Sequence, residues 1–121
     1  MQISRKGDTV YFDVKSDIYF VNAQEIRQII LDNIKETDKT AVVNLSKVEF
    51  MDSSGLSIFI TLLKRVKEKD GKLILEYPQL GVLKFLEMTQ LDKLMEIRKA
   101  DEPKTGSWPE AKGGWPDIEN K

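Results

Sequence analysis

The sequence lacks two residue types that carry much protein chemistry: its 121 residues include no cysteine and no histidine. Without cysteine the chain can form no disulfide, no thiolate nucleophile and no thiolate metal site. Without histidine there is no imidazole base, which excludes Ser-His-Asp catalysis, and zinc sites normally use one of these two residue types. Any enzymatic activity would have to use carboxylates, lysine, tyrosine or hydroxyl groups. We expect a chain that is not an enzyme and that uses no metal and no cofactor. The absence of cysteine also fits a cytoplasmic protein.

Strong net charge and long apolar runs are missing too. The formal net charge is −1, so no overall field attracts nucleic acid or anionic lipid. No run approaches the roughly 18 apolar residues of a membrane span, and no secretory signal is evident at the N-terminus. With 40% apolar and 32% charged residues, the chain suits one hydrophobic core. We expect no direct nucleic-acid binding, no membrane span, and a monomer or weak homodimer.

The composition changes near residue 100. Residues 101–121 hold three of the four prolines and three of the seven glycines. They also contain two similar pieces, Gly-Ser-Trp-Pro-Glu around Trp108 and Gly-Gly-Trp-Pro-Asp around Trp115. Either residues 100–121 are a flexible extension, or the two tryptophans dock on the domain or on a partner. We therefore predict one domain over residues 1–99, followed by a C-terminal tail rich in proline, glycine and tryptophan.

Within residues 1–99 the apolar periodicity alternates between strand and helix patterns. Strands are predicted over residues 2–6, 9–14, 41–45 and 72–76, with a turn and an edge strand around Leu91 to Ile97. Helices are predicted over residues 23–35, with Asn22 as the cap, from Gly55 to about Lys69, and over 80–88. This order predicts an α/β fold with a mainly parallel or mixed sheet and helices packed on it.

The segment that carries the function is the turn Asp52-Ser53-Ser54-Gly55, between an apolar strand and the long amphipathic helix. On a helical wheel, Ser54 falls almost opposite the apolar stripe and should face solvent. Ile58, Thr61 and Arg65 fall on the same outer side, while Ser53 lies at the boundary and could cap the first turn. The inward stripe consists of Leu56, Phe59, Ile60, Leu63 and Val66.

An exposed hydroxyl at a helix N-terminus suits regulation by phosphorylation. A phosphate would add about −1.5 to −2 charges, and the free N–H groups of the first turn tolerate an anion. A partner packed over Ser54 and Ile58, beside Asp52, would tolerate the phosphate less well. This predicts a switch of binding with little change of fold. The alternative is that the two serines only cap the helix.

Residues 42–56, Val-Val-Asn-Leu-Ser-Lys-Val-Glu-Phe-Met-Asp-Ser-Ser-Gly-Leu, resemble the signature of the STAS-domain family, of the anti-sigma factor antagonist (anti-anti-sigma) type. Residues 85–94 resemble the helix and closing turn with which that family usually ends. The similarity covers roughly residues 1–100. It implies a four- to five-stranded mixed sheet with helices packed largely on one side.

The resemblance also implies a function in bacterial signal transduction. Unmodified members of the partner-switching type bind an anti-sigma factor that is also a serine kinase, which frees a sigma factor for transcription. The kinase then phosphorylates the second serine of the motif, here Ser54, with Ser53 the less favoured acceptor, and a PP2C-like phosphatase reverses the modification. The implied partner-binding residues are Asp52, Ser53, Ser54, Gly55 and Ile58.

The chain departs from the family pattern in two places. Many relatives have an acid in the loop before the first helix, where this chain has Tyr19, with Asp17 two residues earlier. We include both residues in the expected partner-binding surface, which is then more apolar. Relatives also usually end in a further helix, where this chain has its Trp-Pro tail.

Two other functions remain open. The chain could be a STAS scaffold or accessory subunit of a transporter or signalling complex that is never phosphorylated. Alternatively, Asp52 could accept a phosphoryl group as in receiver domains. That would need Mg²⁺ held by further acids, for which Asp8, Asp13 and Asp17 are the candidates.

Overall fold

The structure is a computed structural model and describes residues 1–99, so the predictions about the tail and its two tryptophans lie outside the described residues. The described part contains five strands, three α-helices and one 3₁₀ turn. In chain order they are β1 (Gln2–Lys6), β2 (Thr9–Asp13), α1 (Phe20–Asn33), β3 (Thr40–Asn44), α2 (Ser53–Lys67), β4 (Lys72–Glu76), α3 (Leu80–Met88), η1 (Leu91–Lys93) and β5 (Glu96–Arg98).

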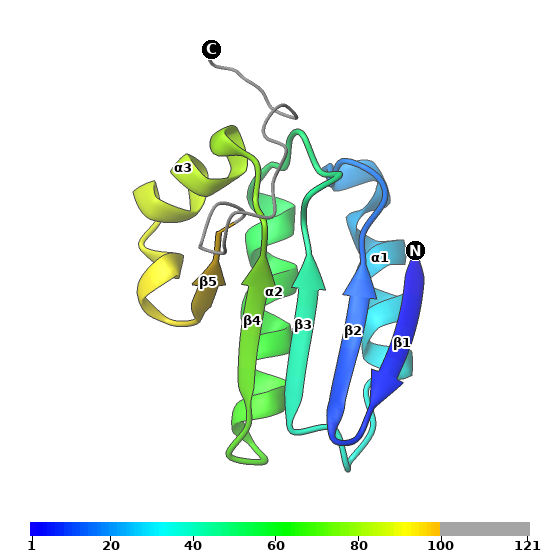
Figure 1. Ribbon diagram of the computed structural model, residues 1–121. Helices are drawn as coiled ribbons and strands as arrows, with labels where there is room; N and C mark the ends of the chain where they lie inside the picture. Colours follow the sequence, from blue (N-terminus) through cyan, green and yellow to red (C-terminus); the bar gives the residue numbers. More distant parts are fainter. Residues whose placement is uncertain (100–121) are drawn as a thin grey trace, which may run out of the picture.

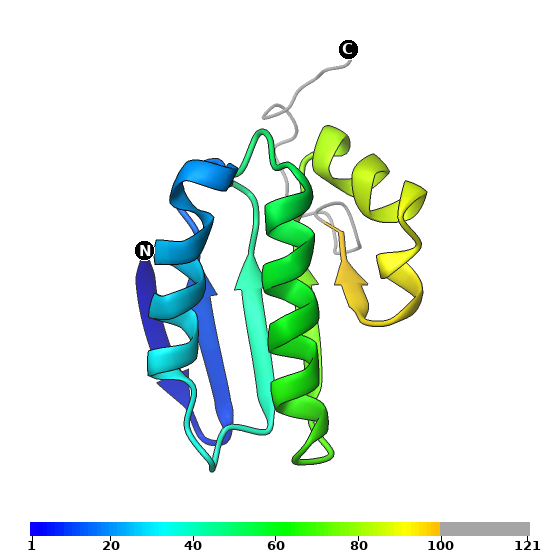
Figure 2. The same ribbon diagram turned by 180° about the vertical axis from the view of Figure 1, so that it is seen from behind.

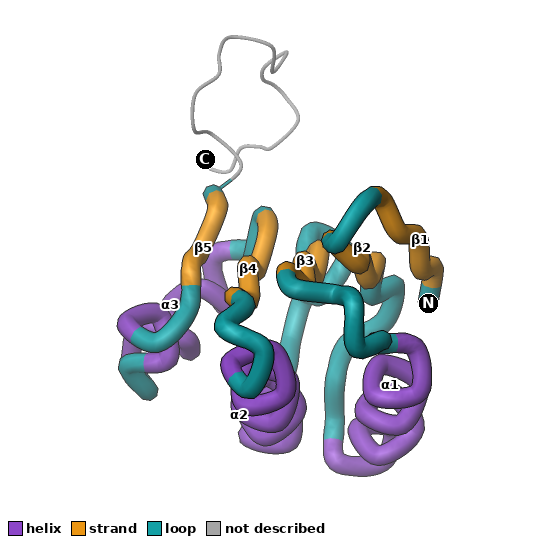
Figure 3. The backbone as a smooth tube through the Cα atoms, turned by 90° about the horizontal axis from the view of Figure 1, so that it is seen from below, coloured by secondary structure: helices purple, strands orange, loops and turns teal. Residues whose placement is uncertain are grey.

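The strands form one mixed sheet in the order β1-β2-β3-β4-β5 (Figure 1). β1 and β2 form an antiparallel hairpin, and the other neighbouring pairs are parallel. All three α-helices lie on the same side of the sheet (Figure 3). The prediction of a mixed sheet with helices largely on one side is therefore confirmed. No helix of residues 1–99 has the length and apolar character needed to cross a bilayer.

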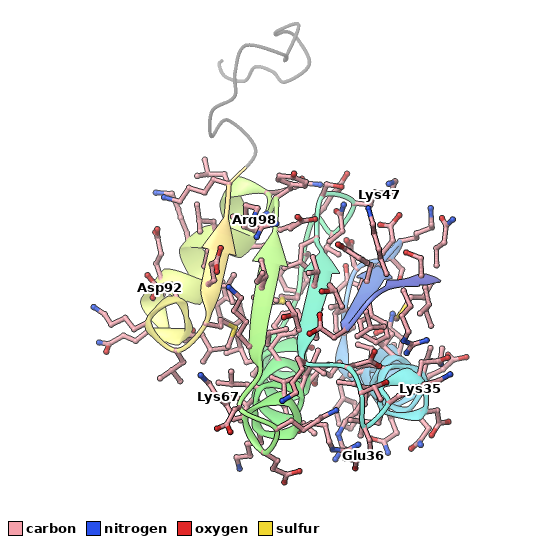
Figure 4. All side chains as sticks on the ribbon, turned by 60° about the horizontal axis from the view of Figure 1, so that its bottom comes forward. Lys35, Glu36, Lys47, Lys67, Asp92 and Arg98 are labelled. Atoms are coloured by element: carbon pink, nitrogen blue, oxygen red, sulfur yellow. The ribbon has the colours of Figure 1, made fainter. Side chains whose placement is uncertain are left out.

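Alternation along the strands separates the two faces of the sheet. Phe12, Val43 and Leu75 are paired in register and are buried under the helices. The opposite face carries no helix of the described residues. On that face, Arg98 on β5 donates to the Glu76 carboxylate on β4 at 2.9 Å. Arg98 is labelled in Figure 4.

The first helix begins earlier than its sequence pattern predicts. α1 starts at Phe20, with Tyr19 as its N-cap, and not at Ala23 with Asn22 as the cap. The Asn22 side chain instead accepts a hydrogen bond from the Tyr19 backbone N–H at 2.8 Å and donates to the Asp17 carbonyl at 2.8 Å. Asn22 therefore still closes the helix end, but from the first turn.

The second helix is rotated relative to the helical-wheel prediction. Its most buried residues are Gly55, Ile58, Phe59, Leu62 and Val66, whereas the predicted stripe residues Leu56, Ile60 and Leu63 are only half-buried. Apolar residues cover more than one side of this helix, so the wheel alone could not fix its orientation. The orientation follows from packing, because α1 covers the flank that the wheel left to solvent (Figure 2).

The loop after α1 and the hairpin are joined by a partly buried ion pair. Asp38 has no exposed surface, and both of its carboxylate oxygens accept hydrogen bonds from Arg5 on β1 at 2.8 Å. The Lys35 backbone N–H donates to the same carboxylate at 2.7 Å. The Arg5 guanidinium, followed by the Lys35 N–H, holds the pKa of Asp38 below its usual value, despite the opposing effect of burial.

A close backbone approach fixes the turn after α2. A Cβ placed on Gly71 would lie 1.9 Å from the Lys39 carbonyl oxygen, so only glycine fits there. The left-handed residue at this helix end is Asp70, with φ of 58°. α2 ends at Lys67, two residues before the predicted end near Lys69; Asp70 makes the turn, and Gly71 is needed for space.

Candidate functional site

Two loops meet at the carboxyl ends of the parallel strands, one before α1 and one before α2 (Figure 2). Ile18 and Met51 form an isolated parallel bridge between them. The Asp17 carboxylate accepts the backbone N–H of Glu49 at 2.7 Å and that of Phe50 at 3.2 Å. The predicted partner-binding residue Asp17 is therefore occupied in holding one loop to the other.

The Asp52 side chain is hydrogen-bonded to the first turns of both α1 and α2. It is the N-cap of α2, where its Oδ1 accepts the Ser54 backbone N–H at 2.8 Å. Its Oδ2 accepts the backbone N–H of Phe20, the first residue of α1, at 3.0 Å. The hydrogen bond from the Ser54 N–H is the main cause that lowers the pKa of Asp52; desolvation opposes it, and the Phe20 N–H adds to the lowering. Both oxygens are thus used to position the serine turn.

The two serines differ from the helical-wheel prediction. Ser53 is exposed and is the first residue of α2, so it does not cap the helix; Asp52 does. Ser54 is half-buried and lies at the groove between α1 and α2. Ser54 still lies at a surface groove, but with α1 beside it.

Gly55 and Ile58 lie inside the domain and not on its surface. Ile58 is 2% exposed and packs in the core, so it cannot be the outer contact that the wheel predicted. Gly55 is buried, and a Cβ placed there would lie 2.8 Å from the Met51 sulfur. Both residues therefore support the turn from below, and Ile58 contributes only to the floor of the groove between α1 and α2.

Tyr19 is exposed, and three further exposed apolar residues, Phe20, Val21 and Phe50, were not predicted as part of its surface. Its ring stacks on Phe50 with centroids 5.2 Å apart. Phe20 and Val21, in the first turn of α1, are 81% and 88% exposed. We call Tyr19, Phe20, Val21 and Phe50 the aromatic patch. The exposure of Phe20 and Val21 could have been predicted from the sequence. On a helical wheel both fall outside the apolar stripe that Ile26, Ile29 and Ile30 form on this helix.

Two grooves flank the serine turn. The groove on the α1 side has a volume of about 410 Å³ and contains Ser54. The groove on the α3 side has a volume of about 540 Å³ and contains Ser53. The α1-side groove is lined by Phe20, Ala23, Arg27, Ser54, Ser57 and Ile58, among others. The α3-side groove is lined by residues that include Phe50, Asp52, Ser53, Val82, Lys84 and Met88. The turn is therefore a ridge between two grooves, of which the α3-side groove is mainly apolar and the α1-side groove carries both apolar and polar side chains.

The acids proposed for a magnesium site are dispersed. Asp8 lies at the opposite end of β3, where its carbonyl accepts the Lys39 N–H, and Asp13 forms salt bridges with Lys15 at 3.4 Å and Lys47 at 3.8 Å. Within residues 1–99 no group of three or more aspartate or glutamate side chains is placed to hold a metal ion. A receiver-like role for Asp52 therefore has no support from the arrangement of these acids.

The family model described as the STAS domain matches residues 1–102. The chain belongs to the STAS-domain family. The anti-sigma-B factor antagonist of Staphylococcus aureus is 28% identical over 86 residues, which cover 71% of this chain and 78% of that protein.

Solved structures share the fold. A candidate anti-sigma factor antagonist of Thermotoga maritima superposes with a TM-score of 0.76 at 24% identity, over 82% of this chain and 86% of that one. The anti-sigma factor antagonist SpoIIAA in its unphosphorylated form gives a TM-score of 0.71 at 23% identity, over 84% and 90% of the two chains. Phosphorylated SpoIIAA of Bacillus gives 0.63 at 22% identity, over 84% and 93%. At these identities the structures establish the fold of this STAS domain.

Proposed function

We propose that this STAS domain is an anti-sigma factor antagonist that works by partner switching. In its unmodified form it binds an anti-sigma factor that is also a serine kinase, and so frees a sigma factor for transcription. Phosphorylation of Ser54 by that kinase ends the complex, and a PP2C-like phosphatase restores it. The chain itself is a cytoplasmic binding module with no catalytic role.

The position of Ser54 is the observation that supports this proposal best. It stands in the first turn of α2, at a surface groove and beside an exposed aromatic patch. The Asp52 carboxylate fixes the turn by accepting the backbone N–H groups of Phe20 and Ser54, and these two bonds do not use the Ser54 hydroxyl, so a phosphate on Ser54 need not unfold it. The same phosphate would place about two negative charges where an apolar partner surface has to pack.

The first experiment locates the modification. The full chain is incubated with ATP and a candidate anti-sigma kinase encoded beside its gene, and the product is measured by intact mass. We expect one added phosphate in wild type and in Ser53→Ala, and none in Ser54→Ala. A phosphate that disappears only in Ser53→Ala would move the acceptor to Ser53.

The second experiment tests the switch. The same kinase is used to pull down wild type, Ser54→Ala and Ser54→Asp. We expect Ser54→Asp to lose at least about tenfold in affinity, which corresponds to about 1.4 kcal/mol, while Ser54→Ala binds like wild type. Equal binding of all three, without phosphate on Ser54, would instead support an unphosphorylated STAS scaffold or an accessory subunit of a transporter or signalling complex.

A further inference from the structure

The α1-side groove brings together Ser54 and a cationic residue of another helix. Ser54 and Arg27 line this groove from α2 and α1, with Gln24 one turn before Arg27 at the same hollow. Helical side chains lean toward the N-terminus of their helix, which directs Arg27 toward the end of the groove where Ser54 lies. Arg27 is half-buried, and within residues 1–99 its guanidinium forms no salt bridge.

The charges around Ser54 otherwise oppose a phosphate. Asp52 is ionised two residues away, with a lowered pKa, and would repel a second anion. Lys84 lines the α3-side groove, on the other side of the serine turn, and Lys47 pairs with Asp13. Lys35 and Lys67 lie at the far end of the molecule from the serine turn (Figure 4). Arg27 is thus the cation that shares a groove with Ser54, and guanidinium is well suited to bind phosphate oxygens.

We propose that the α1-side groove is a built-in receiving site for the phosphoryl group on Ser54, with Arg27 as its cationic ligand and the Gln24 amide as a second donor. This inference rests on the proposed phosphorylation of Ser54. The phosphate then turns into the groove between α1 and α2, away from solvent, and occupies space beside Phe20 that a partner would otherwise use. The modified domain is stable because its own arginine neutralises the added charge.

The two grooves provide a matched comparison. Ser53 lies at the α3-side groove, whose cation is Lys84, and Ser54 lies at the α1-side groove, whose cation is Arg27. If the phosphate on Ser54 binds in the α1-side groove, its second pKa changes when Arg27 is replaced and does not change when Lys84 is replaced. If the phosphate extends into solvent, neither replacement changes its pKa.

The test uses phosphoserine introduced at position 54 of the full chain by genetic code expansion, so no kinase is needed. The second pKa of this phosphate, ordinarily near 6, is measured by ³¹P NMR in the wild-type background and with Arg27→Gln, Arg27→Lys or Lys84→Gln. A neighbouring cation favours the dianion, so we expect Arg27→Gln to raise this pKa by about 0.3–0.7. Arg27→Lys should keep most of the wild-type value, and Lys84→Gln should leave it unchanged.

A second readout needs no variant. The Arg27 side-chain Nε–H resonance should shift between the unmodified chain and the chain with phosphoserine at position 54. The proposal is overturned if this resonance does not move and Arg27→Gln leaves the phosphate pKa at its wild-type value. That failure would leave the proposed function intact, because kinase labelling of Ser54 tests it separately. Conversely, a kinase that never labels Ser54 would refute the proposed function whatever the NMR titration shows.

Discussion

The Asp52 carboxylate accepts the backbone N–H of Phe20 at 3.0 Å, although the two residues are 32 positions apart. Through its other oxygen Asp52 caps its own helix at the Ser54 N–H, at 2.8 Å. One side chain therefore fixes the starts of α1 and α2 relative to each other. The serine turn, the aromatic patch and the α1-side groove all depend on this arrangement.

The first prediction concerns this link. Asp52→Ala removes both acceptors, whereas Asp52→Asn retains one oxygen, so we expect Ala to lower the melting temperature more than Asn. Amide hydrogen exchange should accelerate at Ser54 and Phe20 together. Ser53→Ala is the control and should change the free energy of unfolding by less than about 0.5 kcal/mol. Faster exchange at Ser54 alone would mean that Asp52 caps only its own helix.

The second prediction is a pH dependence caused by Asp38. Its folded-state pKa is lowered by Arg5 and the Lys35 N–H, so the unfolded carboxyl, with a pKa of about 3.9, binds its proton first as pH falls. The stabilising contribution is therefore complete above about pH 5 and is lost as pH falls through the folded-state value. Asp38→Asn should be less stable at neutral pH, by about 1–3 kcal/mol, and should flatten the decline in acid. Urea unfolding at several pH values measures both effects, and an unchanged acid decline in Asp38→Asn would contradict the assignment.

The third prediction distinguishes the observed orientation of α2 from the orientation that the helical wheel predicts. The wheel places Ile58 and Thr61 on the same outer side, whereas Ile58 is 2% exposed in the core. We expect Ile58→Ala to cost about 2–5 kcal/mol of unfolding free energy, because it leaves a cavity. Thr61→Ala should change it by only about 0.5 kcal/mol. Equal small effects of both substitutions in urea unfolding would support the wheel.

The fourth prediction assigns binding to the aromatic patch. Phe20 and Val21 are mostly exposed, so Phe20→Ser with Val21→Ser should leave the melting temperature nearly unchanged. Exposed aromatic side chains often dominate interface energies, so affinity for the anti-sigma kinase should fall at least about tenfold. Leu94→Ser, at another exposed apolar residue, is the control and should bind normally. Wild-type affinity of the double variant, measured by calorimetry, would remove the patch from the interface.

Much of the fold could be predicted because it is encoded locally. The β-branched and aromatic residues of 9–14 and the continuous apolar run of residues 41–45 predicted β2 and β3 to within one residue at each end. The isoleucine spacing predicted α1, with its start wrong by three residues. That error arose because Asn22 satisfies a backbone group from inside the helix, which a simple cap rule does not distinguish from capping.

The candidate site was predicted in part. The serine turn and its motif were recognised from the sequence, and Tyr19 is at the surface as expected. Ile58 and Gly55 were assigned to the surface and are buried. The stacking of Tyr19 on Phe50 and the role of Asp17 were missed, because each joins residues about 30 positions apart. No local pattern indicates such pairs.

The sequence by itself determined the order of strands and helices and the turn that holds Ser53 and Ser54. It could do so because hydrophobic period and capping chemistry act over a few neighbouring residues. The buried side of α2 and the groove that each serine lines could be known only from the packing of the elements. Those outcomes depend on where α1 and α3 pack, and a helix with apolar residues on several sides is compatible with more than one orientation until its neighbours are in place.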